Sequence, residues 1–201
     1  KEDLRPAEAN RFLFWVAPIV VVIPSFLLWV TIPFADGLAV RAIELGLIYL
    51  IGLSVLEVVG LLLAGWGSAS KYSLLGGFRA AAQLVSYETA AGMAVVSGLL
   101  LAGSLSTRRI VEMQAEQGTW FIFLAPIAFF TYLVASIAET NRAPFDLPEA
   151  ESELVAGYMT EYSGFRWALY FLAEYTNMVV VASIATTLFL GGYLRPFAGT
   201  P

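Results

Sequence analysis

The chain has 201 residues, of which 59% are hydrophobic and only 13% are charged, and its formal net charge is −5. A soluble domain carries about twice that share of charged residues, and the mean hydropathy of +0.75 also indicates a membrane protein. The composition therefore argues against a soluble enzyme, a disordered chain and a fibrous repeat, and the negative charge argues against nucleic-acid binding.

The chain contains no Cys and no His. The absence of Cys excludes disulfides, iron–sulfur clusters and thiolate metal sites carried by this chain. The absence of His excludes His-ligated haem, the usual zinc sites and Ser-His-Asp catalysis. We therefore expect no catalytic residue, no metal site and no bound cofactor here, so that any redox centre working with this chain lies on another chain.

Five segments are long and apolar enough to cross a bilayer, because each has at least about 20 residues. They lie near 12–34, 42–65, 80–103, 118–138 and 167–192. Pro18, Pro24 and Pro33 predict a kink in the first segment, and the many Gly, Ala and Ser residues of the next two favour close helix packing. The sequence thus predicts an all-α fold, a single transmembrane domain over 1–201 with five spans.

Lys and Arg are unevenly distributed between the two sides that this topology defines. The side with the N-terminus and the loops at 66–79 and 139–166 holds seven of them, namely Lys1, Arg5, Arg11, Lys71, Arg79, Arg142 and Arg166. The other side holds four, namely Arg41, Arg108, Arg109 and Arg195. The positive-inside rule therefore predicts that the N-terminus and the 139–166 loop are cytoplasmic.

Four carboxylates are predicted at the same membrane depth, without Lys or Arg nearby. Glu57 and Glu88 each lie eight residues from the cytoplasmic end of a span, which is about 12 Å at helical rise. Glu174 lies seven residues into the fifth span, and Glu139 ends the fourth. One such Glu is often only a polar contact inside a bundle, but four at matched depth favour a hydrated path that can pass protons.

The 139–166 loop contains six acids and two Arg. Asp146, followed by Pro148, predicts the start of a short helix that Gly157 could end. On this helix Glu149 and Glu153 are i,i+4 neighbours, whereas Glu151 points elsewhere. A charge run usually marks a solvated loop. However, apolar residues lie between these acids, which favours a surface that packs against a partner: Phe145, Leu147, Leu154, Val155, Tyr158 and Tyr162.

Several stretches together resemble one known family. They are Lys1–Asp3, Gly65–Glu88, Ala138–Gly157, Glu161–Gly164 and Phe171–Asn177, and the longest signature reads AETNRAPFDLPEAESELVAG. They resemble the membrane-embedded H subunit of respiratory complex I, the proton-pumping NADH:quinone oxidoreductase. Members of this family have eight spans, so the resemblance places the first span before Lys1 and the last two after Pro201.

The resemblance implies a translocase subunit that carries no redox centre of its own. Quinone, the substrate, would enter a chamber lined partly by this subunit, with iron–sulfur clusters and flavin on partner subunits. The partners would be other membrane-arm subunits, peripheral-arm soluble subunits docked on the cytoplasmic loops, and the lipid bilayer. The protein would be a multi-pass protein of the cell inner membrane, and its acids would couple quinone reduction to proton pumping.

By position, the resemblance also implies roles for particular residues. Nine acids match the acidic path for proton transfer or coupling: Glu57, Glu88, Glu139, Asp146, Glu149, Glu151, Glu153, Glu161 and Glu174. Lys71 and Arg142 are candidates for partner docking or for pairing with loop acids. Trp66 and Phe145 are candidates for lining the quinone chamber, although aromatic residues at helix ends are more often interface anchors.

Three other functions fit parts of the pattern. A homologous subunit of an energy-converting hydrogenase would share the fold and the acids but need no quinone. A proton-coupled transporter would bind its substrate between repeats near the midplane, and no internal repeat is visible in this sequence. A purely structural anchor explains the loop but not the acids at matched depth.

Overall fold

The computed structural model of the protein describes residues 4–41, 43–146 and 155–195. Its helices are α1 (Arg11–Leu27), η1 (Leu28–Thr31), α2 (Gly46–Gly67), α3 (Lys71–Ala102), α4 (Thr107–Gln117), α5 (Phe121–Leu124), α6 (Pro126–Glu139), η2 (Gly157–Met159) and α8 (Gly164–Phe189). Within these described ranges there is no β-strand, only an isolated bridge between Ala35 and Leu38. The predicted all-α fold is confirmed.

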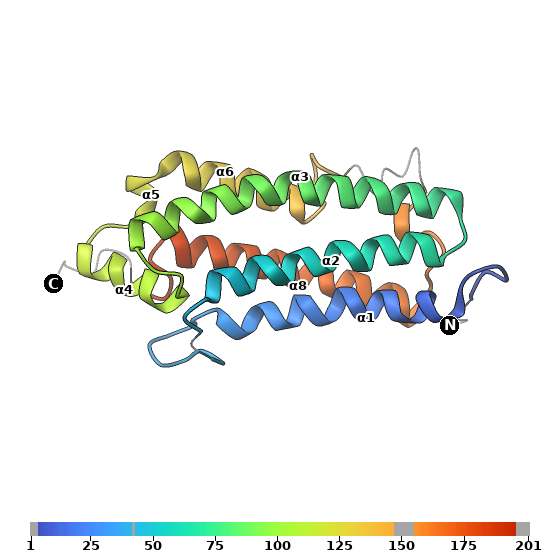
Figure 1. The fold of residues 1–201 in the computed structure, drawn as a ribbon, viewed down its shortest axis with the longest axis horizontal. Coiled ribbons are helices and arrows are strands. Elements are labelled where there is room, and N and C mark those ends of the chain that lie inside the picture. The colour runs from blue at the N-terminus through green and yellow to red at the C-terminus, as the bar shows by residue number, and fades with distance from the viewer. Residues whose placement is uncertain (1–3, 42, 147–154, 196–201) are drawn as a thin grey trace.

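The long helices α1, α2, α3 and α8 run side by side along the molecule (Figure 1). The shorter α6 packs against α3, and α1 packs against both α2 and α8. The described N-terminus lies at the same end of the bundle as the turn between α2 and α3, and α4 lies at the opposite end (Figure 1). The two ends predicted to face opposite sides of a membrane are therefore opposite ends of one elongated bundle.

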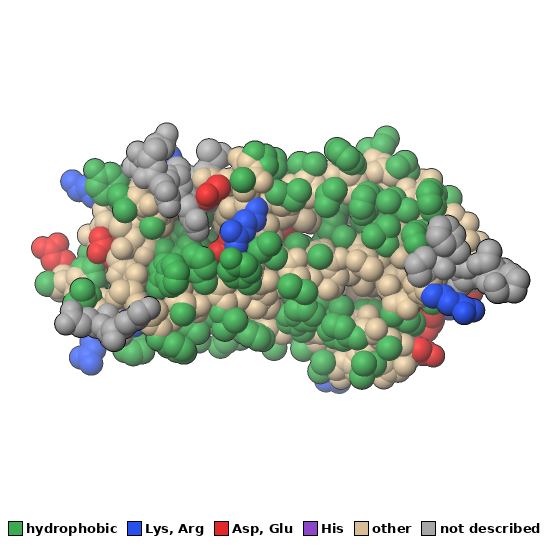
Figure 2. Space-filling view, turned by 180° about the vertical axis from the view of Figure 1, so that it is seen from behind, with side chains coloured by type: hydrophobic (Ala, Val, Ile, Leu, Met, Phe, Trp, Pro, Cys, Tyr) green, Lys and Arg blue, Asp and Glu red, His purple; other side chains and the backbone are tan. Residues whose placement is uncertain are grey.

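Four helical segments are long and apolar enough to cross a membrane: Arg11–Thr31, Gly46–Gly67, Lys71–Ala102 and Gly164–Phe189. Apolar side chains cover most of the face seen in Figure 2, and charged groups gather mainly near its ends. Large side chains such as Ile127 and Leu100 are 82% and 77% exposed, which a water-soluble surface does not tolerate in such number. The chain is therefore a multi-pass membrane protein.

The predicted span at 118–138 differs from the structure, because the helix is interrupted. Helix α5 ends at Leu124, Ala125 leaves the helical conformation, and α6 begins at Pro126, which has no backbone N–H to donate. Gln114 ties the start of α5 to the end of α8: its Oε1 accepts from the Phe121 and Gly191 amides, and its Nε2 donates to the Thr187 carbonyl. The α6 helix has only 14 residues, about 21 Å.

The other boundaries also shift in ways that the local sequence explains. Helix α1 begins after Asn10, whose Oδ1 accepts from the Phe12 and Leu13 amides. Helix α3 begins at Lys71, so most of the predicted 66–79 loop is helical. This helix ends before Gly103, whose φ is 62°. Helix α4 was not predicted, and it buries Ile110, Val111 and Gln114 against the bundle.

After the acidic loop the chain returns to α3 at a close backbone contact. A Cβ atom on Gly76 would lie 2.6 Å from the Gly157 Cα atom, so no side chain fits there. Ser73 Oγ donates to the Tyr158 carbonyl at 2.9 Å beside this contact. Gly157, predicted to end a helix, instead begins the 3₁₀ helix η2. This contact fixes where the loop re-enters the bundle.

Candidate functional site

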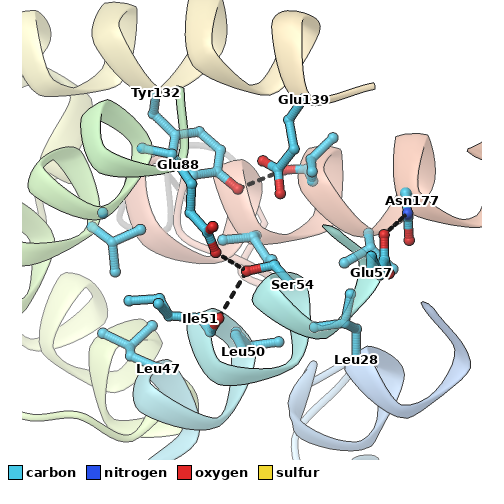
Figure 3. A pocket seen from close by; sticks show the side chains of 16 residues that line it. Leu28, Leu47, Leu50, Ile51, Ser54, Glu57, Glu88, Tyr132, Glu139 and Asn177 are labelled. Atoms are coloured by element: carbon cyan, nitrogen blue, oxygen red, sulfur yellow. Dashed lines mark hydrogen bonds between the residues drawn. The ribbon is translucent and has the colours of Figure 1, made fainter. Parts of the chain in front are cut away.

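Three of the predicted interior acids line one cavity (Figure 3). Glu57 comes from α2, Glu88 from α3 and Glu139 from the last position of α6. The volume open to the centres of water molecules is about 60 Å³, and a single water needs about 10–15 Å³. Most of the remaining wall is apolar, with residues such as Leu50 and Val180. The cavity can therefore hold a few waters among three carboxyl groups.

Glu57 lies where three helices meet. Ser25 Oγ of α1 donates to Glu57 Oε1 at 3.0 Å, and Asn177 Nδ2 of α8 donates to Glu57 Oε2. Both carboxylate oxygens thus accept a hydrogen bond, and both donors are neutral. The site orients Glu57 without supplying a positive charge.

Glu88 has a similar neutral partner. Ser54 Oγ of α2 lies 2.6 Å from Glu88 Oε1 and also 2.9 Å from the Ile51 carbonyl of its own helix (Figure 3). The Tyr132 hydroxyl, also on the cavity wall, donates to the Val181 carbonyl at 3.4 Å. Among the described residues, no donor is found for the second oxygen of Glu88, which faces the cavity.

Glu139 differs from both, because no residue in the described part of the chain donates a hydrogen bond to its carboxyl group. It lies at the cavity next to Tyr132 and Glu88, as Figure 3 shows. Leaving such a group without any hydrogen-bonding partner costs several kcal/mol, so Glu139 needs a partner beyond the described residues, and the cavity has room for water there. The structure thus brings Glu57, Glu88 and Glu139 together at one cavity, and Glu139 is the one of the three that lacks a donor among the described residues.

The expectation that none of the four acids has a cation nearby is wrong for Glu174. Arg142 Nη2 lies 3.0 Å from Glu174 Oε1, and the guanidinium carbon lies 5.1 Å from the Tyr175 ring centroid. Glu174 is not on the cavity wall. After α6 the chain turns at Asn141, with φ 50°, and this turn returns Arg142 to α8. The fourth acid is therefore an ion-paired group that does not line the cavity.

Gln83 of α3 fixes the segment that follows α6. Its Nε2 lies 2.8 Å from the Ala138 carbonyl, 2.8 Å from the Phe145 carbonyl and 3.1 Å from Asn141 Oδ1. The Phe145 ring also packs edge-on against Tyr87 at 5.3 Å. Irregular backbone at membrane depth needs such partners, since lipid offers none. Gln83 thereby holds in place the segment that carries Arg142.

The remaining predicted residues lie at separate places. Asp146 and Lys71 are exposed, Glu161 is half-buried before α8, and the side chain of Trp66 at the end of α2 is 71% exposed. Glu149, Glu151, Glu153 and the helix predicted after Asp146 lie outside the described residues. Within the described ranges, no three acids are arranged to hold a metal ion.

Sequence reasoning missed the groups that partner the acids, Ser25, Ser54 and Asn177. It also missed Gln83, which holds the segment after α6. A general signal was available, because a hydroxyl or amide inside a span has to find a hydrogen-bonding partner in a neighbouring helix. Ser54 lies three residues before Glu57 on the same helix. The packing of four helices decides which acid each group contacts, and this packing cannot be read from the sequence alone.

The fold and the cavity together define a class: a polytopic α-helical membrane protein with uncompensated carboxyl groups inside its bundle. A family model described as NADH dehydrogenase matches residues 1–200. The chain therefore belongs to the NADH dehydrogenase family.

Named relatives are similar over nearly the whole chain. It is 53% identical to an H subunit of NADH-quinone oxidoreductase from Koribacter versatilis, over 98% of this chain and 49% of that protein. It is 52% identical to an H subunit of this enzyme from Solibacter usitatus and 50% identical to the one from Salinibacter ruber, again over 98% of this chain, and covers 51% and 58% of those proteins. The resemblance to this membrane subunit is confirmed, and the chain spans about half the length of the first two relatives.

Proposed function

We propose that this chain is part of a membrane subunit of a proton-translocating NADH:quinone oxidoreductase, and that its cavity is part of the acidic path that couples quinone reduction to proton pumping. The observation that carries the proposal is that Glu57, Glu88 and Glu139 share a cavity with room for water and with neutral donors only. A carboxyl group paired with a cation is held charged, whereas one partnered by a hydroxyl or amide can be charged or neutral. Such groups joined by water can take up and pass on protons.

The flanking residues support the two ends of this path. The segment 140–146, held by Gln83, leads from the cavity towards the acidic loop. We place the bundle end with the N-terminus and the α2–α3 turn in the cytoplasm, on the inner-membrane side where Lys and Arg are more numerous. Soluble subunits that carry the iron–sulfur clusters and flavin would dock there. Quinone would approach near Phe145 and Trp66.

The names of the relatives favour the quinone enzyme over a hydrogenase of shared ancestry, because the three relatives described above are quinone oxidoreductase subunits. A proton-coupled transporter would use acids in the same way but would function without a redox partner. The proposal therefore requires that the acids matter only for the coupled reaction of an assembled complex.

Substituting Glu88 tests the proposal in the full complex. We expect Glu88→Gln to lower NADH-driven quinone reduction and proton pumping at least about tenfold, because Gln keeps the shape but cannot bind a proton. Reduction of a hydrophilic artificial acceptor by NADH should be unchanged. The matched control is Glu116→Gln at the exposed surface of α4, which should pump normally. Full pumping by an assembled Glu88→Gln complex would refute the proposal.

A further inference from the structure

Two serines of the bundle share an unusual arrangement. Ser25 Oγ lies 2.9 Å from the Val21 carbonyl and 3.0 Å from Glu57 Oε1. Ser54 Oγ lies 2.9 Å from the Ile51 carbonyl and 2.6 Å from Glu88 Oε1. A hydroxyl group has one hydrogen to donate and can also accept. Each serine thus has two acceptors within reach of its single hydrogen.

Three other helical serines show only the first of these two contacts. Ser86, Ser97 and Ser183 each donate to the carbonyl four residues earlier, and within the described chain they have no carboxylate partner. This back-bonding is what a serine inside a helix ordinarily does. The two serines beside the acids therefore combine an ordinary helical hydrogen bond with a second one to a carboxyl group.

The arrangement fits both protonation states of the acid. When the carboxyl group is charged, the serine donates to it, and the helix carbonyl keeps the N–H bond of the helix. When the carboxyl group is protonated, it can donate to the serine oxygen, and the serine hydrogen turns to the helix carbonyl. Only the hydroxyl hydrogen rotates, and no hydrogen bond of the acid is lost in either state.

At Glu57 this rotation supplies the acceptor for a bound proton. Its two oxygens face Ser25 and the amide nitrogen of Asn177, so both face donors. A proton added to Oε2 would point at an N–H group, which cannot accept it. A proton added to Oε1 finds an acceptor once Ser25 turns its hydrogen to the Val21 carbonyl. Ser25 is fully buried, with 0% exposure, so bulk water does not take its place.

We propose that Ser25 and Ser54 are positioning residues whose hydroxyl groups reverse their hydrogen bonds so that Glu57 and Glu88 can bind and release protons inside the bundle. This inference rests on the proposed function of the cavity. The proton arrives from cavity water and returns to it, and the serines neither gain nor lose one. The titratable groups that face these two acids are each other and, from α6, Tyr132 and Glu139, whereas the cavity residues of α8 are uncharged.

The test compares serine variants in the assembled complex. We expect Ser25→Ala and Ser54→Ala each to lower coupled quinone reduction about tenfold, because each acid loses a hydrogen bond in both states. The solvent deuterium isotope effect on turnover should rise, since proton binding becomes rate-limiting. Ser54→Thr, which keeps the hydroxyl at a half-buried position, should restore both values. Ser183→Ala is the control and should match the unmodified protein.

The possible outcomes separate this inference from the proposed function. If the alanine variants match Ser183→Ala while Glu88→Gln loses pumping, the inference is wrong and the function stands. If the alanine variants are slow but keep the original isotope effect, their role is structural and the inference is again wrong. If Ser25→Ala does not assemble, the Ser54 pair of variants decides. If Glu88→Gln also pumps normally, the proposed function itself fails.

Discussion

Carboxyl groups occur in two regions of this molecule, on the surface at α4 and inside the bundle, and their partners differ. At α4 the acids Asp36, Glu112 and Glu116 pair with Arg108 and Arg109 at N–O distances of 2.8–3.3 Å. Hydrogen bonds to Glu112 and Glu116 raise the pKa of Arg109 above its usual value. The acids of this surface group therefore lie beside guanidinium groups, which carry a fixed positive charge.

Inside the bundle, the hydrogen-bond donors that contact the cavity glutamates are neutral. Glu57 accepts from a hydroxyl and an amide, Glu88 from a hydroxyl, and Glu139 has no donor among the described residues. Glu174 is the intermediate case, because it lies near the cavity helices but pairs with Arg142. Under the proposed function, the partner decides whether a carboxyl group keeps one charge or changes it during turnover.

The largest effect on coupled quinone reduction is expected when a positively charged side chain is placed in the cavity. Asn177→Lys would place an ammonium group beside Glu57, as Arg109 is placed beside Glu112. We expect coupled quinone reduction to fall about 100-fold, because an opposite charge in a low dielectric holds the carboxylate charged. NADH oxidation with a hydrophilic acceptor should persist. Asn177→Gln, which keeps a neutral amide, is the control, and equal loss in both variants would contradict the account.

The second prediction concerns Glu174, whose cationic partner Arg142 can be removed. Arg142→Met leaves a mostly buried carboxylate unpaired, and we expect a loss of about 1–3 kcal/mol in the free energy of unfolding. Adding Glu174→Gln to Arg142→Met should recover much of that loss, since no uncompensated charge remains. Thermal unfolding of the purified complex measures both. If the double variant is no more stable than Arg142→Met, the two residues are not coupled.

The smallest effect is expected at the surface pairs. Arg109→Gln removes exposed ion pairs that are worth about 0–1 kcal/mol, so stability and pumping should both stay close to those of the unmodified protein. Raising the salt concentration should reduce even this difference, because exposed charges are screened. A loss of pumping as large as that of the cavity variants would show that the surface group belongs to the coupling path.

The sequence was sufficient to predict the helices and the depths of the acids, but not the residues that contact the acids. Apolar segments and the rise per residue were enough to place Glu57, Glu88 and Glu139 at one level, where the structure brings them to one cavity. The break at Pro126 was not predicted because the surrounding residues are as apolar as any span. Gln114, which anchors the start of α5, lies on a helix that was not predicted either.

The pairing of Arg142 with Glu174 could not be predicted for a different reason. The two residues are far apart in the sequence, and a turn at Asn141 with positive φ brings them together. Sequence spacing carries information along one helix, but it carries none about such a turn. The same holds for Ser25 and Asn177, which reach Glu57 from two other helices.

Under the proposed function, the cavity acids change protonation during turnover. Infrared difference spectroscopy of the assembled complex detects such a change directly. Spectra recorded before and after quinone reduction should contain bands of protonated carboxyl groups that are altered in Glu57→Gln and Glu88→Gln. The same bands should be unchanged in Glu116→Gln. Identical carboxyl bands in the unmodified protein and both cavity variants would contradict the claim, because the acids would then keep one protonation state throughout the reaction.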